Sequence, residues 1–295
     1  MKRNTLTSIK DYLAAHSWIS VVFKLAVTIV CLWYVSRKIN WLLTLQLLNG
    51  SNKLWLVLAA VCFTFSKLVA ALRLNIYFKN IQVNLPQLKN ISLYWLGMFY
   101  NLFLPGGIGG DAYKVIVLSR RNMQSVKKLS AAVLLDRISG VAGLAILVAI
   151  YYFLIFKGSQ FSGWLLLAVA PGLVVYYFFI KKVFYSFISS CWITLLLGTI
   201  VQFLQVLCVY CLMASINITQ HHNEFVLLFL LSSIVAILPF TIGGLGAREV
   251  VFLWGSKQFG LDLNQSIYIS LLFYLITVLV SLVGVRWMYK EPLEA

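Results

Sequence analysis

Two heptapeptides, Leu104–Gly110 (LPGGIGG) and Leu238–Gly244 (LPFTIGG), interrupt apolar stretches of this chain. In both copies a cation follows four residues after the last glycine, as Lys114 and as Arg248. Proline and glycine break helices, and a helix broken in hydrocarbon exposes backbone groups unless protein or a water-filled cavity satisfies them. Matched interruptions in the two halves of a membrane protein are typical of a transporter's binding site.

The composition predicts an integral membrane protein. The 295 residues are 61% hydrophobic and 11% charged, whereas a soluble domain has about 45–50% apolar and about 25% charged residues. Six apolar runs predict full spans, near residues 17–36, 54–72, 132–156, 163–180, 189–215 and 265–287. Each run reaches the roughly 17–25 residues that a bilayer core requires. The first run is too long for a signal peptide, so we interpret it as a retained span.

Two shorter apolar runs, Ile91–Leu104 and Phe225–Leu238, each stop at a motif proline. With 14 residues each, helices over these runs rise about 21 Å and fall short of a core about 30 Å thick. We therefore predict two re-entrant helical hairpins, about 91–120 and 225–258, whose Pro-Gly tips lie near the middle of the membrane. The alternative is that each motif kinks a helix pair that crosses fully.

The distribution of positive charge predicts the topology. With the N-terminus in the cytoplasm and each hairpin entering and leaving on one side, fourteen loop cations face the cytoplasm. Four face the opposite side, namely Arg37, Lys38, Lys53 and Lys157. This bias follows the positive-inside rule and predicts both termini in the cytoplasm. Three spans separate the hairpins, so the hairpins enter from opposite sides as an inverted repeat. The expected fold is one all-α polytopic membrane domain over residues 1–295.

The helices that follow the glycine pairs are candidates for anion binding. Gly109-Gly110 and Gly243-Gly244 permit a sharp turn, so the next helix begins with free N–H groups that suit an anion. Lys114 and Arg248 add full charges about one turn inside. We therefore predict a site for an anionic lipid headgroup. The alternative is that the glycines permit close helix packing while the cations reach toward a membrane interface.

Charged residues inside a membrane are costly and are usually paired. Asp111 follows the first glycine pair, where it caps the helix or pairs with Lys114, and a role as a proton acceptor in a coupled cycle also stays open. Glu249 is the neighbour of Arg248. Lys67 and Lys257 are interpreted as reaching an interface or facing a wet cavity.

The sequence LDRISG places Asp136 and Arg137 side by side. In one helix these two side chains point in different directions, so each is expected to pair with another segment, as a structural salt bridge or as a ligand contact. Arg73 is predicted at the cytoplasmic end of its span, as an interface anchor or an outer headgroup contact. The candidate translocation residues are Lys114, Arg248, Asp111, Glu249, Asp136, Arg137, Pro105, Gly106, Gly107, Gly109, Gly110, Pro239, Gly243, Gly244 and Arg73.

The charge balance and the absence of motifs limit the classes of partner. A net charge of +16, from 24 basic and 8 acidic residues, favours contact with anionic lipid in a membrane protein. No nucleic-acid-binding module is recognisable. Gly106–Lys114 lacks the spacing of a nucleotide-binding loop, and no pattern resembles a metal site. We expect no cofactor, no metal, no nucleic-acid partner and no direct use of ATP.

Three segments resemble a known family: Asn101–Lys114 (NLFLPGGIGGDAYK), Leu135–Gly140 (LDRISG) and Leu238–Glu249 (LPFTIGGLGARE). In this combination and order they look like the flippase-like transmembrane domain of lysylphosphatidylglycerol synthases, including its short stand-alone members. The resemblance implies an integral bacterial or archaeal membrane protein that moves lipids or lipid-linked molecules between leaflets. Because the chain ends at Ala295, we expect none of the synthase activity that a further soluble domain supplies. Isoprenoid and hopanoid lipids stay open as cargo.

Three hypotheses follow for function. The first is a lipid translocator of the cytoplasmic membrane, passive or ion-coupled, that is not an enzyme. The second is an intramembrane lipid-modifying enzyme with Asp111 or Asp136 as its general base, although no nucleophile–base pair is recognisable. The third is a non-catalytic membrane subunit that recruits a lipid synthase. Membrane lipids with anionic headgroups are the expected partners, together with further copies of the chain or a lipid-synthesis enzyme.

Overall fold

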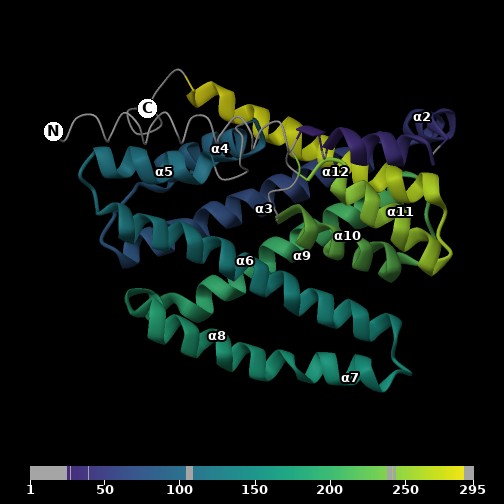
Figure 1. Ribbon diagram of the computed structural model, residues 1–295. Helices are drawn as coiled ribbons and strands as arrows, with labels where there is room; N and C mark the ends of the chain where they lie inside the picture. Colours follow the sequence, from purple (N-terminus) through teal and green to yellow (C-terminus); the bar gives the residue numbers. More distant parts are fainter. Residues whose placement is uncertain are drawn as a thin grey trace.

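The computed structural model describes residues 25–26, 28–38, 40–103, 109–237, 241 and 244–288. Within these ranges the chain is helical and forms no strand (Figure 1). Five helical segments are long and apolar enough to cross a membrane. These are α3 (Lys53–Asn80), α6 (Val126–Ile155), α7 (Gln160–Leu167) with α8 (Val169–Val183), η1 (Tyr185–Ser190) with α9 (Cys191–Ser215), and α12 (Leu263–Leu282) with η2 (Val283–Trp287). The predicted all-α polytopic class is confirmed. Of the first predicted span, 17–36, the structure describes residues 25–26 and 28–36, which are helical.

The helix α3 continues well past residue 72, where the sequence predicted its span to end. Leu74, Tyr77 and Phe78 lie in its last two turns and are fully buried. They pack in a cluster with Phe187 of η1 and other residues. Because these apolar side chains need burial, the helix extends beyond the charge of Arg73 and places that residue inside the bundle.

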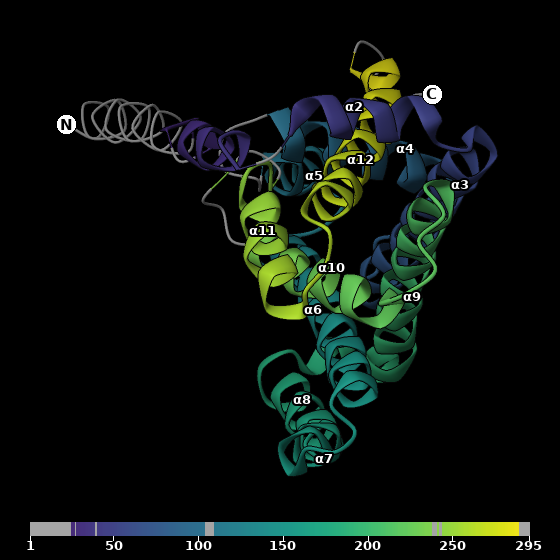
Figure 2. The ribbon, with the colours of Figure 1, turned by 90° about the vertical axis from the view of Figure 1, so that its right-hand side faces the viewer.

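The predicted span near 163–180 is broken into α7 and α8 at Ala168. Pro171 has no N–H to donate to the carbonyl of Leu167, so the regular helical bond is missing at this point. Only 6% of the most apolar window of this span is buried. The α7–α8 span therefore lies at the outer edge of the bundle, where it packs on α6 and η1 (Figures 1 and 2).

The inner scaffold is made by α3, α6 and α9. A Cβ atom on Gly143 of α6 would lie 2.7 Å from the backbone of Gly198 in α9, so the two helices touch through their backbones. Small residues at such a crossing allow the close van der Waals packing that holds helices together in lipid.

Two helical hairpins pack onto this scaffold. The first consists of α4 (Gln87–Phe103) and α5 (Gly109–Arg120), and the second of α10 (His222–Ile237) and α11 (Ala247–Phe259). With 17 and 16 residues, α4 and α10 rise about 24–26 Å, less than a bilayer core of about 30 Å. Within each hairpin the two helices pack against each other. The Pro-Gly tips themselves lie outside the described residues.

The two hairpins enter from opposite ends of the bundle. Gln124, in the loop that follows α5, donates to the carbonyl of Ile81 just past the end of α3 (2.9 Å). By contrast, the ring of Phe259 at the end of α11 lies 6.2 Å from the ring of Phe156, just past the end of α6. Figure 1 shows α4–α5 at one end and α10–α11 at the other. The opposite orientation of the two helical hairpins agrees with the predicted inverted pair, while their re-entrant placement in a membrane stays a prediction.

Each hairpin has its own hydrophobic core. Leu93 of α4 and Leu118 of α5 belong to a cluster with the second half of α3 and the first half of α6. Phe229 of α10 and Phe252 of α11 belong to a separate cluster with α9 and α12. Residues of both hairpins line a cavity between these two cores.

Candidate functional site

A cavity of about 410 Å³ lies between the two hairpins. Its lining residues come from eight helices, α3, α4, α5, α6, α9, α10, α11 and α12, and from Thr241 between α10 and α11. Seven of the lining residues are charged: Lys67, Arg73, Asp111, Lys114, Asp136, Arg137 and Arg248. Five cations and two carboxylates leave the cavity wall with a net charge of +3.

Arg73 and Asp136 form a buried ion pair that joins α3 to α6. The Arg73 Nε atom lies 2.7 Å from Asp136 Oδ1, and both side chains are largely inaccessible. A Cβ atom on Gly140 or Gly198 would lie 3.3 or 3.1 Å from Arg73 Nη1, so these glycines leave the space that the guanidinium occupies. Arg73 therefore lines the cavity and is not an interface anchor, which was one of its two predicted roles.

Asp111 pairs with two cations at once. Lys114 Nζ lies 3.0 Å from Asp111 Oδ1, and Arg137 Nε lies 2.6 Å from Asp111 Oδ2. The ammonium of Lys114 also lies 4.6 Å from the ring centroid of Tyr94. The predicted contact of Asp111 with Lys114 is confirmed, and so is the expectation that Asp136 and Arg137 pair with different segments. This cluster keeps one positive charge in excess of its carboxylate.

Lys67 and Arg248 have no carboxylate partner among the described residues. Each lies over an aromatic ring instead, with Lys67 Nζ 4.5 Å from the centroid of Phe63 and Arg248 Cζ 5.0 Å from that of Phe273. The rings of Phe63 and Phe273 are 5.4 Å apart, and Phe229 packs on Phe273 at 4.6 Å. Two cations thus share one aromatic cluster, where ring quadrupoles attract them without neutralising them.

The first amides of the helices after the glycine pairs are already used by the protein. Gly110 N–H donates to Asn101 Oδ1 (2.9 Å). Gly246 N–H donates to Glu249 Oε2 (2.6 Å), and the hydroxyl of Ser270 donates to the other oxygen (2.8 Å). Glu249 is fully buried and does not line the cavity. The expectation of free amides does not hold at these two positions, so the positive charge of the site comes from side chains.

The glycines of the two motifs have different tasks. A Cβ atom on Gly110 would lie 1.8 Å from the carbonyl oxygen of Gly97, so α5 packs directly on the backbone of α4. Gly244 and Gly246 have φ values of +85° and +84°, which a side chain disfavours, and they form a turn before α11. Of the two predicted roles for the glycines, close helix packing therefore holds at Gly110 in the first motif, and a sharp turn holds at Gly244 in the second. The predicted site residues Pro105, Gly106, Gly107, Pro239 and Gly243 lie outside the described residues.

Buried polar atoms without a hydrogen-bond partner gather in the cavity. Arg73 Nη1, Gln202 Oε1 and Thr241 Oγ1 are three such atoms, and all three residues line it. A bound ligand or water is needed to satisfy them. Gln202 and Thr241 were not among the predicted site residues. Gln202 could have been noticed as one of few amides inside an apolar span.

The edge of the cavity is apolar and open. Val141 of α6 and Ile237 of α10 line it and keep 41% and 43% of their surfaces exposed. Exposed aliphatic side chains beside a charged interior suit a ligand with one polar and one hydrocarbon part.

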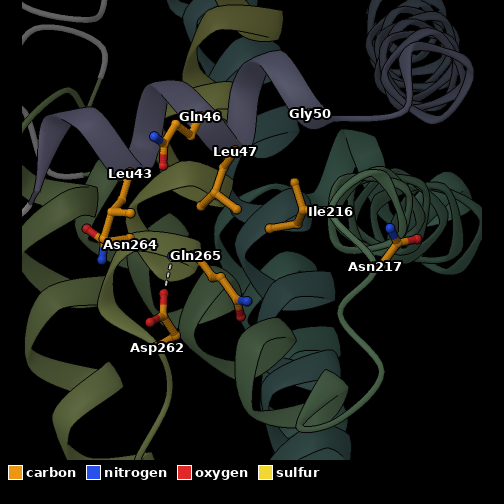
Figure 3. Close-up of a pocket in the computed structure, with 9 residues that line it drawn as sticks. All are labelled: Leu43, Gln46, Leu47, Gly50, Ile216, Asn217, Asp262, Asn264 and Gln265. Atoms are coloured by element: carbon orange, nitrogen blue, oxygen red, sulfur yellow. Dashed lines mark hydrogen bonds between the residues drawn. The ribbon is translucent and has the colours of Figure 1, made fainter.

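A second cavity, of about 380 Å³, lies between α2 (Trp41–Gly50), the loop after α9 and the start of α12 (Figure 3). Asp262 is the one charged residue in its lining. This carboxylate accepts the N–H of Gln265 (2.8 Å) as the N-cap of α12. A cavity with no cation in its wall does not attract an anion, so the charged cavity is the better candidate site.

Comparison with known proteins agrees with this architecture. The family described as "Lysylphosphatidylglycerol synthase TM region" matches residues 21–284. The chain is also similar to a UPF0104 membrane protein of Pyrococcus horikoshii, with 25% identity over 137 residues. That alignment covers 46% of this chain and 40% of the relative, so it spans less than half of the relative's length.

Proposed function

This chain belongs to the family of the lysylphosphatidylglycerol synthase TM region, and we propose that it moves the headgroup of an anionic lipid between the leaflets of a membrane. One observation carries this proposal. A cavity with a net charge of +3 is lined by residues of both hairpins, which lie at opposite ends of the bundle. A lipid headgroup that crosses a bilayer needs such a polar site near the middle of its path.

The charge of the cavity supports an anionic ligand in particular. Cations inside a membrane are costly unless they are paired or serve a function. Lys67 and Arg248 keep no carboxylate partner in the described part of the chain, so a bound anion supplies the missing countercharge. The acyl chains remain in lipid at the edge formed by Val141 and Ile237, which are exposed.

The inverted arrangement supplies a route for translocation. Because α4–α5 and α10–α11 reach the cavity from opposite ends, a small rotation of one hairpin against the other opens the site to one side and closes it to the other. A headgroup neutralised by the cavity wall crosses the interior at a lower cost than a free charge does. We propose alternating access of this kind, driven by a lipid gradient or by a coupled ion.

We further propose that the domain carries no catalysis of its own. Asp111 and Asp136 each accept a hydrogen bond from a cation of the cavity wall, so these carboxylate oxygens are already engaged and less available to take a proton from a substrate. We also propose placement in a prokaryotic cytoplasmic membrane with both termini inside, and partners limited to lipids, further copies of the chain or a lipid-synthesis enzyme. No contact among the described residues favours the enzyme or the recruiting subunit as a function.

A leaflet-exchange assay in proteoliposomes tests the proposal. The purified protein is reconstituted with headgroup-labelled phosphatidylglycerol, and the label accessible to a membrane-impermeant quencher is followed over time. We expect exchange with the unchanged chain and its loss in the double variant Lys114→Ala plus Arg248→Ala. The matched control is Lys257→Ala, which removes a cation from an exposed position on α11. Equal rates of exchange by the double variant and the control would show that the lipid headgroup does not pass through the cavity.

A further inference from the structure

We propose that the cavity selects lipids whose headgroup carries two or more negative charges on terminal phosphate oxygens, as a phosphomonoester or a diphosphate does. It discriminates against zwitterionic and aminoacylated headgroups. This inference rests on the proposed transport of a lipid headgroup and names the class of that headgroup.

The positive charge of the cavity favours a headgroup with two or more negative charges. The Asp111 cluster retains one positive charge, and Lys67 and Arg248 add two more. A phosphodiester headgroup brings a single negative charge and leaves most of this excess uncompensated. A phosphomonoester brings about −1.5 to −2 near neutral pH, and a diphosphate brings more. A lysyl ester adds ammonium groups to the headgroup, so its net charge has the wrong sign for this cavity.

The hydrogen-bond donors of the cavity wall also favour a terminal phosphate. Arg73 Nη1 is buried without a partner, and Lys67 and Arg248 make no hydrogen bond to a carboxylate among the described residues. Arginine and lysine present several N–H donors each, and guanidinium groups match phosphate oxygens well. A terminal phosphate offers three such oxygens, whereas a phosphodiester has two non-bridging oxygens that share one negative charge, and its other two oxygens carry carbon substituents. The donor set therefore fits a terminal phosphate better.

The positions of Lys67 and Arg248 also favour a terminal phosphate. Lys67 belongs to the scaffold helix α3 and Arg248 to the second hairpin, and their rings Phe63 and Phe273 are neighbours. A terminal phosphate between the two cations links the hairpin to the scaffold. The cavity of about 410 Å³ corresponds to roughly a dozen water volumes of about 30 Å³ each. A phosphate or diphosphate with a few waters fits that space.

Binding of short-chain lipids to the intact protein in detergent tests the inference. The probes are dihexanoyl phosphatidic acid, dihexanoyl phosphatidylglycerol and dihexanoyl lysylphosphatidylglycerol, followed by calorimetric titration. We expect phosphatidic acid to bind about tenfold or more tightly than phosphatidylglycerol, and the lysyl ester to bind weakest. Lys67→Gln and Arg248→Gln each reduce this preference toward unity, while Lys257→Gln leaves it unchanged. Monodisperse elution of every variant shows that it is folded.

Inorganic phosphate and pyrophosphate form a further arm of the titration. If either ion bound as tightly as phosphatidic acid, the cavity would be a site for a free anion, and the proposal that its ligand is a lipid would be wrong. Equal affinity for phosphatidic acid and phosphatidylglycerol, or tighter binding of the lysyl ester, would overturn the charge argument. Selective binding of phosphatidic acid without any leaflet exchange would instead reject the transport function and leave the headgroup class standing.

Discussion

The two hairpins share one sequence pattern and differ in what surrounds their cations. In the first hairpin, Lys114 contacts Asp111 at 3.0 Å. In the second, Arg248 lies over Phe273, while the adjacent Glu249 faces away from the cavity and accepts the amide of Gly246. The two hairpins therefore share a sequence pattern, but their cations differ in whether a carboxylate neutralises them. The first half neutralises most of its charge internally, and the second half offers its charge to a ligand.

The hairpins also differ in how they are held. The first hairpin is fixed by contact between the backbones of Gly97 and Gly110. The second depends on a turn with positive φ at Gly244 and Gly246 and on the buried cap Glu249. Direct backbone contact leaves little freedom to slide, whereas a glycine turn concentrates flexibility at one place. We infer that the second hairpin is the part that moves during transport.

Asp111→Asn is expected to have the largest effect on stability. The change leaves Lys114 and Arg137 without their shared carboxylate in a largely buried position. Breaking a buried pair in this way costs about 3–5 kcal/mol. We expect a strongly lowered thermal unfolding midpoint in detergent. The control is Asp262→Asn, because asparagine caps a helix about as well as aspartate does. Similar midpoints for the two variants would show that the first hairpin does not depend on internal neutralisation.

Gly110→Ala tests the backbone contact of the first hairpin. The new methyl group would lie 1.8 Å from the carbonyl oxygen of Gly97, so α4 and α5 must separate. Overpacking of this kind costs about 1–3 kcal/mol, and we expect the upper end because the clash is with backbone.

Gly163→Ala is the matched control in α7, where an added Cβ meets nothing within 4 Å. The measurement is the fraction of monodisperse protein after graded heating. An unchanged fraction for Gly110→Ala would contradict the close approach of the two helices.

The sequence predicted the architecture well because hydropathy and helix length are properties of short segments. Two short runs ended by proline were enough to predict hairpins such as α4–α5. The family resemblance, carried by three motifs, is confirmed by the match over residues 21–284. The rule that intramembrane charges are paired also predicted that Asp136 and Arg137 contact different segments.

The remaining features of the site depend on contacts between distant segments. In the described part of the chain, Lys67 and Arg248 contact aromatic rings from α3 and α12 and no carboxylate, and no local pattern shows this. Gln202 and Thr241 line the cavity through the crossing of helices. The amide of Gly246 is occupied because Glu249 folds back on it, whereas the glycine motif predicted free amides at the start of this helix.

Glu249→Gln is expected to have a moderate effect on the second hairpin. The glutamine oxygen can still accept the N–H of Gly246, and the hydroxyl of Ser270 can rotate to accept from the new amide. What is lost is the charge-assisted part of two hydrogen bonds, about 1 kcal/mol in total. We expect a small decrease in the unfolding midpoint, well below that of Asp111→Asn. A loss as large as that of Asp111→Asn would mean that both hairpins rely equally on a buried acid.

Arg248→Gln is expected to have the smallest effect on stability and a large effect on transport. The guanidinium has no carboxylate partner in the described part of the chain, so its removal leaves no carboxylate there without a partner. The variant also avoids the free-energy cost of burying a cation. The unfolding midpoint should remain unchanged or rise slightly, while leaflet exchange of labelled phosphatidylglycerol falls about tenfold or more. Lys114→Gln makes the reverse comparison, because it leaves Asp111 with Arg137 alone and should lower the midpoint. If Arg248→Gln destabilised the protein more than Lys114→Gln, the charge asymmetry between the hairpins would be wrong.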